Sequence, residues 1–194
     1  LYDKEFAILK VVSKKESNSE PSYRVVLYQG LVKSDKIELV IQKGVELGVS
    51  EIVPVICNRC VIKFKDEGDI AKKVSRWNKI AMEAAKQSGR GIIPEVKSPL
   101  KFEDALYKMK NSEVAFIPWE SEDGNTIKEI ISKAKSVENP EISFVIGPEG
   151  GFSIEEISRA KDFEIPTVTL GKRILRTETA GLAVLSMILY ELEL

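Results

Sequence analysis

Apolar and polar residues follow two different periods along the chain. Short runs rich in Val, Ile, Leu and Tyr predict strands, and apolar residues three or four positions apart predict helices. The predicted strands cover residues 5–12, 23–32, 51–57, 93–97, 113–118, 142–146 and 165–170. The predicted helices cover residues 34–47, 69–88, 101–110, 124–136, 153–162 and 178–193. Asp35 and Glu38 form the predicted capping pair of the first helix, and Gly48 ends it.

Strands and helices alternate from residue 34 onward, and this order predicts a parallel sheet covered by helices on both faces. Ligands bind such sheets at the carboxyl ends of the strands. The loops after residues 118, 146 and 170 are therefore the candidate sites. We predict one α/β domain over residues 33–194.

Residues 1–32 do not fit this alternation. Two strands joined by the polar loop 14–21 cannot form a stable domain by themselves. We expect residues 1–32 to be the remnant of a small β domain. Because the chain begins with Leu1 rather than Met, we also expect the natural N-terminus to be missing.

The composition is that of an ordinary globular protein, with 194 residues of which 43% are hydrophobic and 30% charged. Its apolar runs are too short for a transmembrane helix, and no secretory signal is visible. Histidine is absent, which excludes Ser-His-Asp and Cys-His catalysis within the chain and any His-ligated metal site. We expect no metal site.

Cys57 and Cys60 form a C-x-x-C and are the two cysteines of the chain. They are too few for a disulfide framework or a four-cysteine zinc site, so we expect structural thiols in a reducing cytoplasm.

Charge is unevenly distributed, although the net charge is only −1. Residues 1–110 carry 21 basic and 15 acidic side chains, and residues 111–194 carry 8 and 15. Within residues 59–101, 11 basic residues stand against five acidic ones. The mixture of charged, aromatic and amide side chains there suits RNA, with Arg59, Arg76, Gln87 and Arg90 as candidate contacts. A lysine-rich solvated helix face is the alternative.

The strongest local motif runs from Gly147 to Gly151 as Gly-Pro-Glu-Gly-Gly, between a buried strand and a helix that opens at Ser153 with Glu156 as capping partner. Its glycines permit positive φ angles and close approach of a ligand to the backbone. An ordinary strand-to-helix turn needs fewer special residues, so we favour a binding site. The motif is neither a dinucleotide fingerprint nor a P-loop.

A second loop, over residues 170–180, alternates apolar and charged side chains. Apolar residues beside free backbone amides suit a purine base, and an arginine there can hold a polar substrate. A solvated loop whose leucines cover the core explains the same pattern equally well. The third loop, Ile117 to Glu120, is uninformative by itself.

These motifs together resemble the RsmE family of 16S ribosomal RNA uridine-N3 methyltransferases. The resemblance spans about residues 30–194. It is carried by Gly147–Gly151 and by Leu170-Gly171-x-Arg173-Ile174-Leu175-Arg176-x-Glu178-Thr179-Ala180. Three upstream segments support it: Gln42-Lys43-x-x-Glu46-Leu47-Gly48-Val49, Pro54 with Arg59-Cys60, and Glu83-Ala84-x-x-Gln87-Ser88-x-Arg90 with Pro94.

The resemblance implies a SPOUT fold, which is a parallel sheet with a trefoil knot near the C-terminus, and a homodimer. It implies S-adenosyl-L-methionine (SAM) bound in the knot, and methylation of N3 of a uridine in the decoding region of the small ribosomal subunit. It also implies an N-terminal PUA-like β-barrel that helps to bind RNA, of which this chain holds only the end, up to about Val32.

The resemblance also assigns expected roles to single residues. The adenine is expected against Leu170, Ile174 and Leu175, with Gly147, Gly150 and Gly171 giving backbone contacts, Ile117 and Pro118 closing one side, and Thr179 and Ala180 completing the cofactor site.

Methylation at N3 requires the loss of a proton from uridine, and the resulting anion needs a cation near O2 or O4. Arg176 is our candidate for that cation. Glu178 either accepts the proton, directly or through water, or fixes Arg176. Glu149 has the same two possible roles or faces the cofactor, and the sequence does not separate them.

Two other functions fit parts of the sequence: a non-catalytic RNA-binding module, and a nucleotide-binding enzyme of different chemistry. Neither explains why the glycine turn and the Leu-Gly-x-Arg loop follow successive strands. Binding of SAM or S-adenosylhomocysteine separates the methyltransferase from the RNA-binding module.

Overall fold

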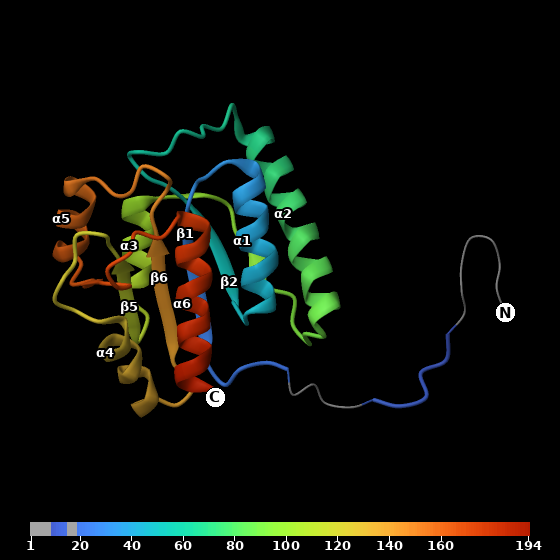
Figure 1. The fold of residues 1–194 in the computed structure, drawn as a ribbon. Coiled ribbons are helices and arrows are strands. Elements are labelled where there is room, and N and C mark those ends of the chain that lie inside the picture. Colours follow the sequence, from blue (N-terminus) through green and yellow to red (C-terminus); the bar gives the residue numbers. More distant parts are fainter. Residues whose placement is uncertain (1–8, 15–18) are drawn as a thin grey trace.

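The computed structural model describes residues 9–14 and 19–194 of the chain, and within them it shows a seven-stranded sheet (Figure 1). The strand order is β3-β2-β1-β6-β5-β7, with β4 also paired to β2, and every pairing is parallel. The strands are β1 (Arg24–Gly30), β2 (Glu51–Ile56), β3 (Glu95–Val96), β4 (Leu100–Lys101), β5 (Val114–Pro118), β6 (Glu141–Ile146) and β7 (Thr167–Val168).

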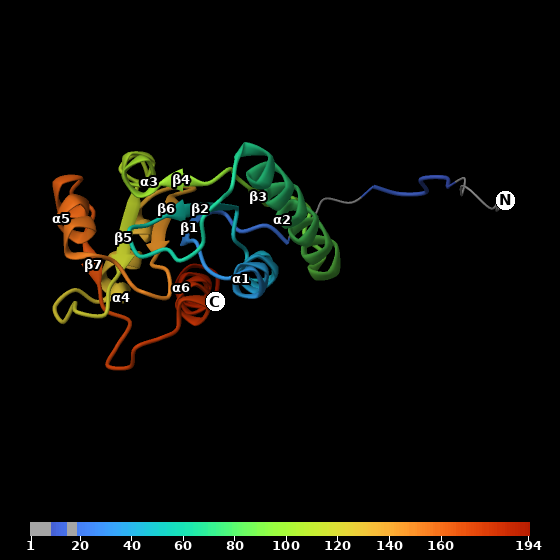
Figure 2. The ribbon, with the colours of Figure 1, turned by 90° about the horizontal axis from the view of Figure 1, so that it is seen from above.

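Helices cover both faces of this sheet, as predicted. They are α1 (Ser34–Glu46), α2 (Glu67–Ser88), α3 (Phe102–Met109), α4 (Ile127–Ser132) with the 3₁₀ turn η1 (Lys133–Ser136), α5 (Ile154–Asp162) and α6 (Thr177–Leu192). Seen from above, α1 and α6 lie on one side of the sheet and α3 on the other (Figure 2).

The alternation of side chains along β1 builds the two halves of the core. Val25 and Leu27 pack with α1, α4 and α6, whereas Val26 and Tyr28 pack with α3 and α5. Residues 25–30 are all buried, which is typical of a central parallel strand. The predicted α/β class and parallel sheet are confirmed.

The boundary expected at residue 32 does not fit this sheet. The strand predicted over 23–32 is β1, which pairs with β2 on one side and β6 on the other, so it belongs to the α/β domain. Of the strand predicted over 5–12, residues 5–8 lie outside the described residues, and residues 9–12 form no strand. A remnant of a β domain would therefore have to precede residue 24, and it stays an expectation.

Several predicted element ends also differ from the structure. α1 has Lys33 at its N-cap position and no side-chain cap, so the predicted pair of Asp35 and Glu38 lies inside the helix; Glu38 accepts a hydrogen bond from Arg76 at 2.8 Å. β3 and β7 have two residues each, shorter than predicted, and β4 was not predicted. The helix predicted over 124–136 begins later, at Ile127 after the capping residue Thr126, and tightens into η1.

No helix among residues 9–14 and 19–194 is long and apolar enough to cross a membrane.

Candidate functional site

The three loops selected from the sequence surround one cavity of about 780 Å³ at the carboxyl edge of the sheet, the upper edge in Figure 1. This volume lies within the range of small-molecule sites. The cavity is lined by residues 118–120, 122–123, 146–152 and 169–177, together with Lys36 and Ala180. Parallel strands bring these loops together because their carboxyl ends share one edge.

The glycine turn after β6 is held rigidly from both of its ends. Gly151 has a φ of 67° and donates its amide to the carbonyl of Pro148 at 2.9 Å. The next residue, Phe152, is buried against Phe102, with ring centroids 5.5 Å apart. Ser153 and Glu156 form the predicted capping box of α5.

The loop after β2 supports the same turn. Asn58 donates its amide to Glu156 Oε1 at 2.8 Å and its side-chain nitrogen to Ser153 Oγ at 3.0 Å. Arg59 donates from Nη1 to the carbonyl of Gly150 at 3.0 Å. Asn58 and Arg59, which do not line the cavity, thus hold the start of α5 and the glycine turn in place.

The end of β1 approaches the glycine turn more closely than any side chain would allow. A Cβ atom at Gly30 would lie 2.6 Å from the nitrogen of Pro148 and 2.8 Å from the carbonyl carbon of Gly147. Only glycine fits here without moving backbone. The sequence analysis missed Gly30 because it placed β1 in another domain.

A buried hydrogen-bond chain joins the same region to α6. Gln29, fully buried, donates from Nε2 to Thr177 Oγ1 at 2.9 Å. Thr177 in turn donates to the carbonyl of Gly147 at 2.6 Å. The first residue of α6 is therefore tied to both central strands of the sheet.

The loop over 170–176 forms a second wall. Leu170 and Leu175 are half-buried and pack against the core, as a slot for an apolar group requires. Ile174 also lines the cavity but is 84% exposed. Gly171 has a φ of 100°, with open space where a Cβ would lie.

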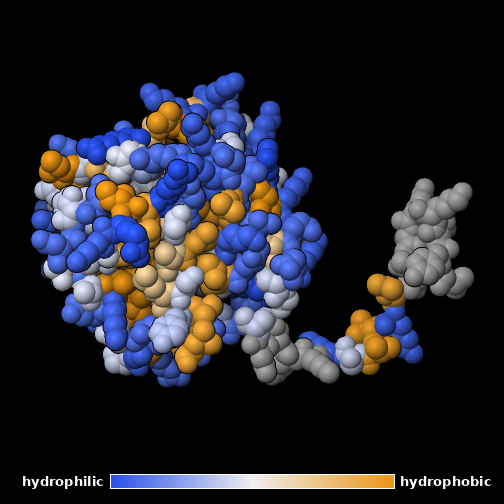
Figure 3. Space-filling view, viewed as in Figure 1, coloured by the Kyte–Doolittle hydropathy of each residue, from blue (hydrophilic) through white to orange (hydrophobic). Residues whose placement is uncertain are grey.

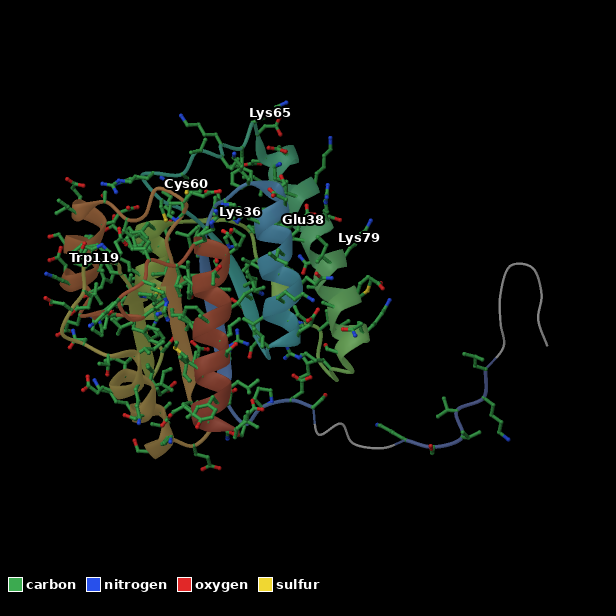
Figure 4. The ribbon with its side chains drawn as sticks, in the orientation of Figure 1. Lys36, Glu38, Cys60, Lys65, Lys79 and Trp119 are labelled. Carbon is green, nitrogen blue, oxygen red and sulfur yellow. The ribbon has the colours of Figure 1, made fainter. Side chains whose placement is uncertain are left out.

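The loop after β5 forms the third wall, with Pro118, Trp119 and Glu122 (Figure 4 labels Trp119). A hydrogen bond from Thr167 and the amides of Asn125 and Gly124 hold the pKa of Glu122 below its ordinary value. This wall therefore carries an ionised carboxylate at neutral pH.

Some residues expected at the cofactor do not line the cavity. Ile117 is fully buried behind the wall. Thr179 is exposed on α6, outside the lining. The other predicted cofactor residues (Pro118, Gly147, Glu149, Gly150, Leu170, Gly171, Ile174, Leu175 and Ala180) all lie on the cavity wall.

The predicted catalytic pair is not a pair in the structure. Arg176 is exposed at the start of α6, lines the cavity, and its guanidinium has no ion-pair partner among the described residues. Glu178 does not line the cavity and faces Lys36, with Oε2 and Nζ 3.4 Å apart. Glu178 thus forms its ion pair with Lys36 rather than with Arg176, and whether it accepts the proton or fixes Arg176 through the first turn of α6 stays a prediction.

Lys36 also reaches Glu149, whose Oε1 lies 3.4 Å from the same Nζ. Lys36 is not among the predicted site residues, because β1 was assigned to a separate domain and the segment that follows it was not recognised as part of the site. The order of elements could have pointed to it, because residues 34–36 follow the carboxyl end of β1, and β1 lies in the same sheet as the strands that precede the other three loops.

The four predicted RNA contacts differ in accessibility. Arg59 and Gln87 are exposed, and the Arg76 side chain is 68% exposed beside Glu38. Arg90 is only 5% exposed, and its guanidinium binds Glu20 and the carbonyls of Val45 and Val49. Arg90 is therefore a structural residue, and its predicted role in RNA contact is not supported.

Comparison with known sequences places these features in a family. A family model described as an RNA methyltransferase domain matches residues 18–189. Ribosomal RNA small subunit methyltransferase E of Bacillus subtilis is 38% identical over 188 residues, covering 95% of this chain and 72% of the relative. The enzyme of that name from Mesomycoplasma hyopneumoniae is 37% identical, covering 91% and 74%.

The chain belongs to the ribosomal RNA small subunit methyltransferase E family.

Two solved structures superpose closely on the chain. A methyltransferase E from Neisseria gonorrhoeae, bound to S-adenosyl methionine, has a TM-score of 0.80 at 34% identity and covers 91% of this chain and 69% of its own. A methyltransferase from Legionella pneumophila, in complex with the cofactor SAM, has a TM-score of 0.83 at 33% identity, with the same coverage. The family expected from the two C-terminal motifs is confirmed.

Proposed function

We propose that this chain binds SAM in the cavity at the carboxyl edge and transfers its methyl group to N3 of a uridine in the decoding region of 16S ribosomal RNA. The observation that carries the proposal is that the glycine turn and the 170–176 loop, the two motifs that mark the family, line the same cavity. Two relatives with the same fold have been solved with SAM bound.

The residues on the cavity wall fit this cofactor. Half-buried Leu170 and Leu175 offer an apolar surface for the adenine, with Ala180 beside them. Gly147, Gly150 and Gly171 bring backbone without side chains to the cavity wall. The ionised Glu122 supplies an acceptor for polar groups on the third wall.

Bound in this cavity, SAM would supply an electrophilic methyl group on a positively charged sulfur. The chain must then orient the uridine for in-line transfer and exclude water from the reacting atoms. Arg176 is the exposed cation that borders the cavity at the start of α6, suited to stabilise negative charge on O2 or O4. Glu149, which lines the cavity, is better placed to receive the N3 proton than Glu178, which does not.

The RNA would lie across the surface formed by the loop after β2 and by α2, where many of the basic residues of 59–101 are found. Arg59 connects this surface to the glycine turn through Gly150, and Arg76 and Gln87 follow on the exposed face of α2. Lys72 and Lys79 line a shallow depression beside Arg76. Figure 4 shows Lys65 and Lys79 projecting from this side of the molecule. Such a surface suits phosphate contacts.

The knot and the homodimer belong to the same proposal. The hydrogen-bond chain from Gln29 through Thr177 to Gly147 supports a C-terminal segment threaded tightly against the central strands. An apolar strip follows the outer face of α6 on the face shown in Figure 3, where Met187 and Tyr190 are 37% and 70% exposed. A second copy packed on this strip would bury it.

The test is transfer of a labelled methyl group from SAM to small ribosomal subunits that lack the modification, followed by nucleoside analysis. We expect N3-methyluridine from the wild-type chain and none from Arg176→Ala, with S-adenosylhomocysteine affinity unchanged within about twofold in the variant. Subunits bound without methyl transfer would favour the non-catalytic RNA-binding module. Equal methylation by both proteins would remove Arg176 from the mechanism.

A further inference from the structure

Lys36 lies where three elements of the cofactor site meet. It belongs to the first turn of α1, and its Nζ is 3.4 Å from Glu149 in the glycine turn and 3.4 Å from Glu178 in the first turn of α6 (Figure 4 labels Lys36). Glu149 also approaches the start of α1 through the amide of Lys33, at 3.5 Å. One ammonium group therefore connects three segments that are far apart in sequence.

The cluster is partly removed from solvent. The side chains of Lys36, Glu149 and Glu178 are 25%, 29% and 14% exposed. Glu178 Oε2 is buried and has no hydrogen-bond partner among the described residues, so the charge of Lys36 is what compensates it. Without the ammonium, two carboxylates would share this site uncompensated, and such groups repel each other strongly when water is scarce.

Lys36 differs from the other cations on the cavity wall. Lys172, Arg173 and Arg176 lie together on one exposed loop and make no ion pair within the described part of the chain. Lys36 bridges carboxylates from two different elements. Its two ion pairs suit it to hold the glycine turn and the first turn of α6 in fixed positions relative to each other.

We propose that Lys36 is a positioning residue of the methyltransferase site. Through Glu149 it fixes the glycine turn and so governs cofactor affinity; through Glu178 it fixes the first turn of α6, and with it Arg176, and so governs turnover. This inference rests on the proposed function. Lys36 acts through these two carboxylates and needs no contact with the reacting atoms.

The first test compares Lys36→Met with Lys36→Arg and with Lys43→Met. Lys43 lies on the same helix and, among the residues that the structure describes, pairs only with its neighbour Glu46, so its substitution is a matched control. We expect Lys36→Met to weaken S-adenosylhomocysteine binding about tenfold and to lower kcat at saturating SAM by a similar factor. Lys36→Arg should recover most of both losses, because it keeps the charge.

A second test separates the effect of Lys36 on Glu149 from its effect on Glu178. In a Glu149→Gln background, Lys36→Met should have little further effect on S-adenosylhomocysteine affinity; in a Glu178→Gln background, it should have little further effect on kcat. Additive losses in both backgrounds would show that Lys36 does not act through these carboxylates, and would overturn the proposal.

A third measurement does not depend on methyl transfer. Amide hydrogen exchange of the cofactor-free chain should be faster in Lys36→Met than in Lys43→Met, specifically over residues 147–152 and 177–181. Exchange and S-adenosylhomocysteine binding like those of Lys43→Met would overturn the proposal for Lys36. If the wild-type chain binds no S-adenosylhomocysteine, the proposed function fails, and the exchange data still decide whether Lys36 holds the two segments together.

Discussion

At the scale of single residues, Gly30 shows how closely the backbone is packed around the cavity. Its Cβ position lies within 3 Å of three backbone atoms of residues 146–148, which cannot move without displacing β6 or the glycine turn. Nothing in the local sequence of β1 marks this glycine, because the crowding comes from a segment more than a hundred residues away. The restriction is tertiary, so only the fold reveals it.

We predict that Gly30→Ala lowers the free energy of unfolding by about 3 kcal/mol or more, because a methyl group there forces backbone apart. Gly48→Ala is the control: Gly48 has a φ of 88° but open space at its Cβ, so only about 1 kcal/mol is expected. Urea denaturation of both variants measures the difference. Equal losses would mean that the contact at Gly30 relaxes at little cost.

The two cysteines differ in predicted reactivity. A hydrogen bond between the thiols raises the pKa of buried Cys57 and lowers that of Cys60, which also accepts the amide of Cys57 at 3.2 Å. Since the thiolate is the reactive form, Cys60 should be alkylated by iodoacetamide at a lower pH than free cysteine, and Cys57 should stay unmodified. Mass spectrometry of the alkylated chain over a pH series tests this, and modification of Cys57 first would contradict it.

At the scale of elements, the sequence predicted all six helices, although with some displaced ends, and its most consequential error was to assign β1 to a separate domain. Hydrophobic spacing located α2 to within two residues, and the predicted cap of Ser153 and Glu156 located the start of α5, because both signals are local. β1 was recognised as a strand, but its partners β2 and β6 could not be read from its sequence. That error hid Gly30, Gln29 and Lys36, all near the end of β1.

The ion pair between Arg90 and Glu20 could not be predicted from the sequence either, because the two residues are 70 positions apart. Burial raises the pKa of Glu20, but the hydrogen bond from Arg90 and the amides of Ile92 and Gly91 outweigh it, so the pKa lies below its ordinary value. A carboxylate of lowered pKa contributes stability that is complete above the unfolded-state pKa and is lost as pH falls through the folded-state pKa.

We predict that Glu20→Gln lowers the free energy of unfolding by about 2 kcal/mol at pH 7, because it leaves a buried guanidinium unpaired. The difference from wild type should be complete above the ordinary pKa of glutamate and should shrink as the pH falls through the lowered pKa of folded Glu20. Glu83→Gln, which removes an exposed pair with Lys86, should change stability by no more than about 0.5 kcal/mol. A pH-independent loss at Glu20 would show that charge is not its source.

At the scale of the whole molecule, α6 is the helix that joins the core, the cavity and the outer surface. Its first turn is tied to Gly147, its inner side contributes Val184, Leu185 and Ile188 to the core, and its outer side leaves an apolar strip exposed (Figure 3). A strip of this kind on a small protein favours association with a partner.

We predict a homodimer through this strip. Light scattering should give twice the chain mass of 21.7 kDa, and Met187→Glu should reduce it to the mass of one chain, because a carboxylate would be buried in the interface. Tyr107→Glu, on the exposed side of α3, is the control and should stay dimeric. A wild-type monomer at micromolar concentration would rule out this interface.

The central claim, that the cavity at the carboxyl edge is a SAM site, is tested most directly by calorimetric titration of S-adenosylhomocysteine into the chain. We predict one site per chain with a dissociation constant in the micromolar range, lost in Leu175→Trp, whose larger side chain would obstruct the apolar slot, and retained in Tyr107→Trp, which lies outside the cavity lining. The absence of binding to the folded wild-type chain, or equal binding by Leu175→Trp, would contradict the account.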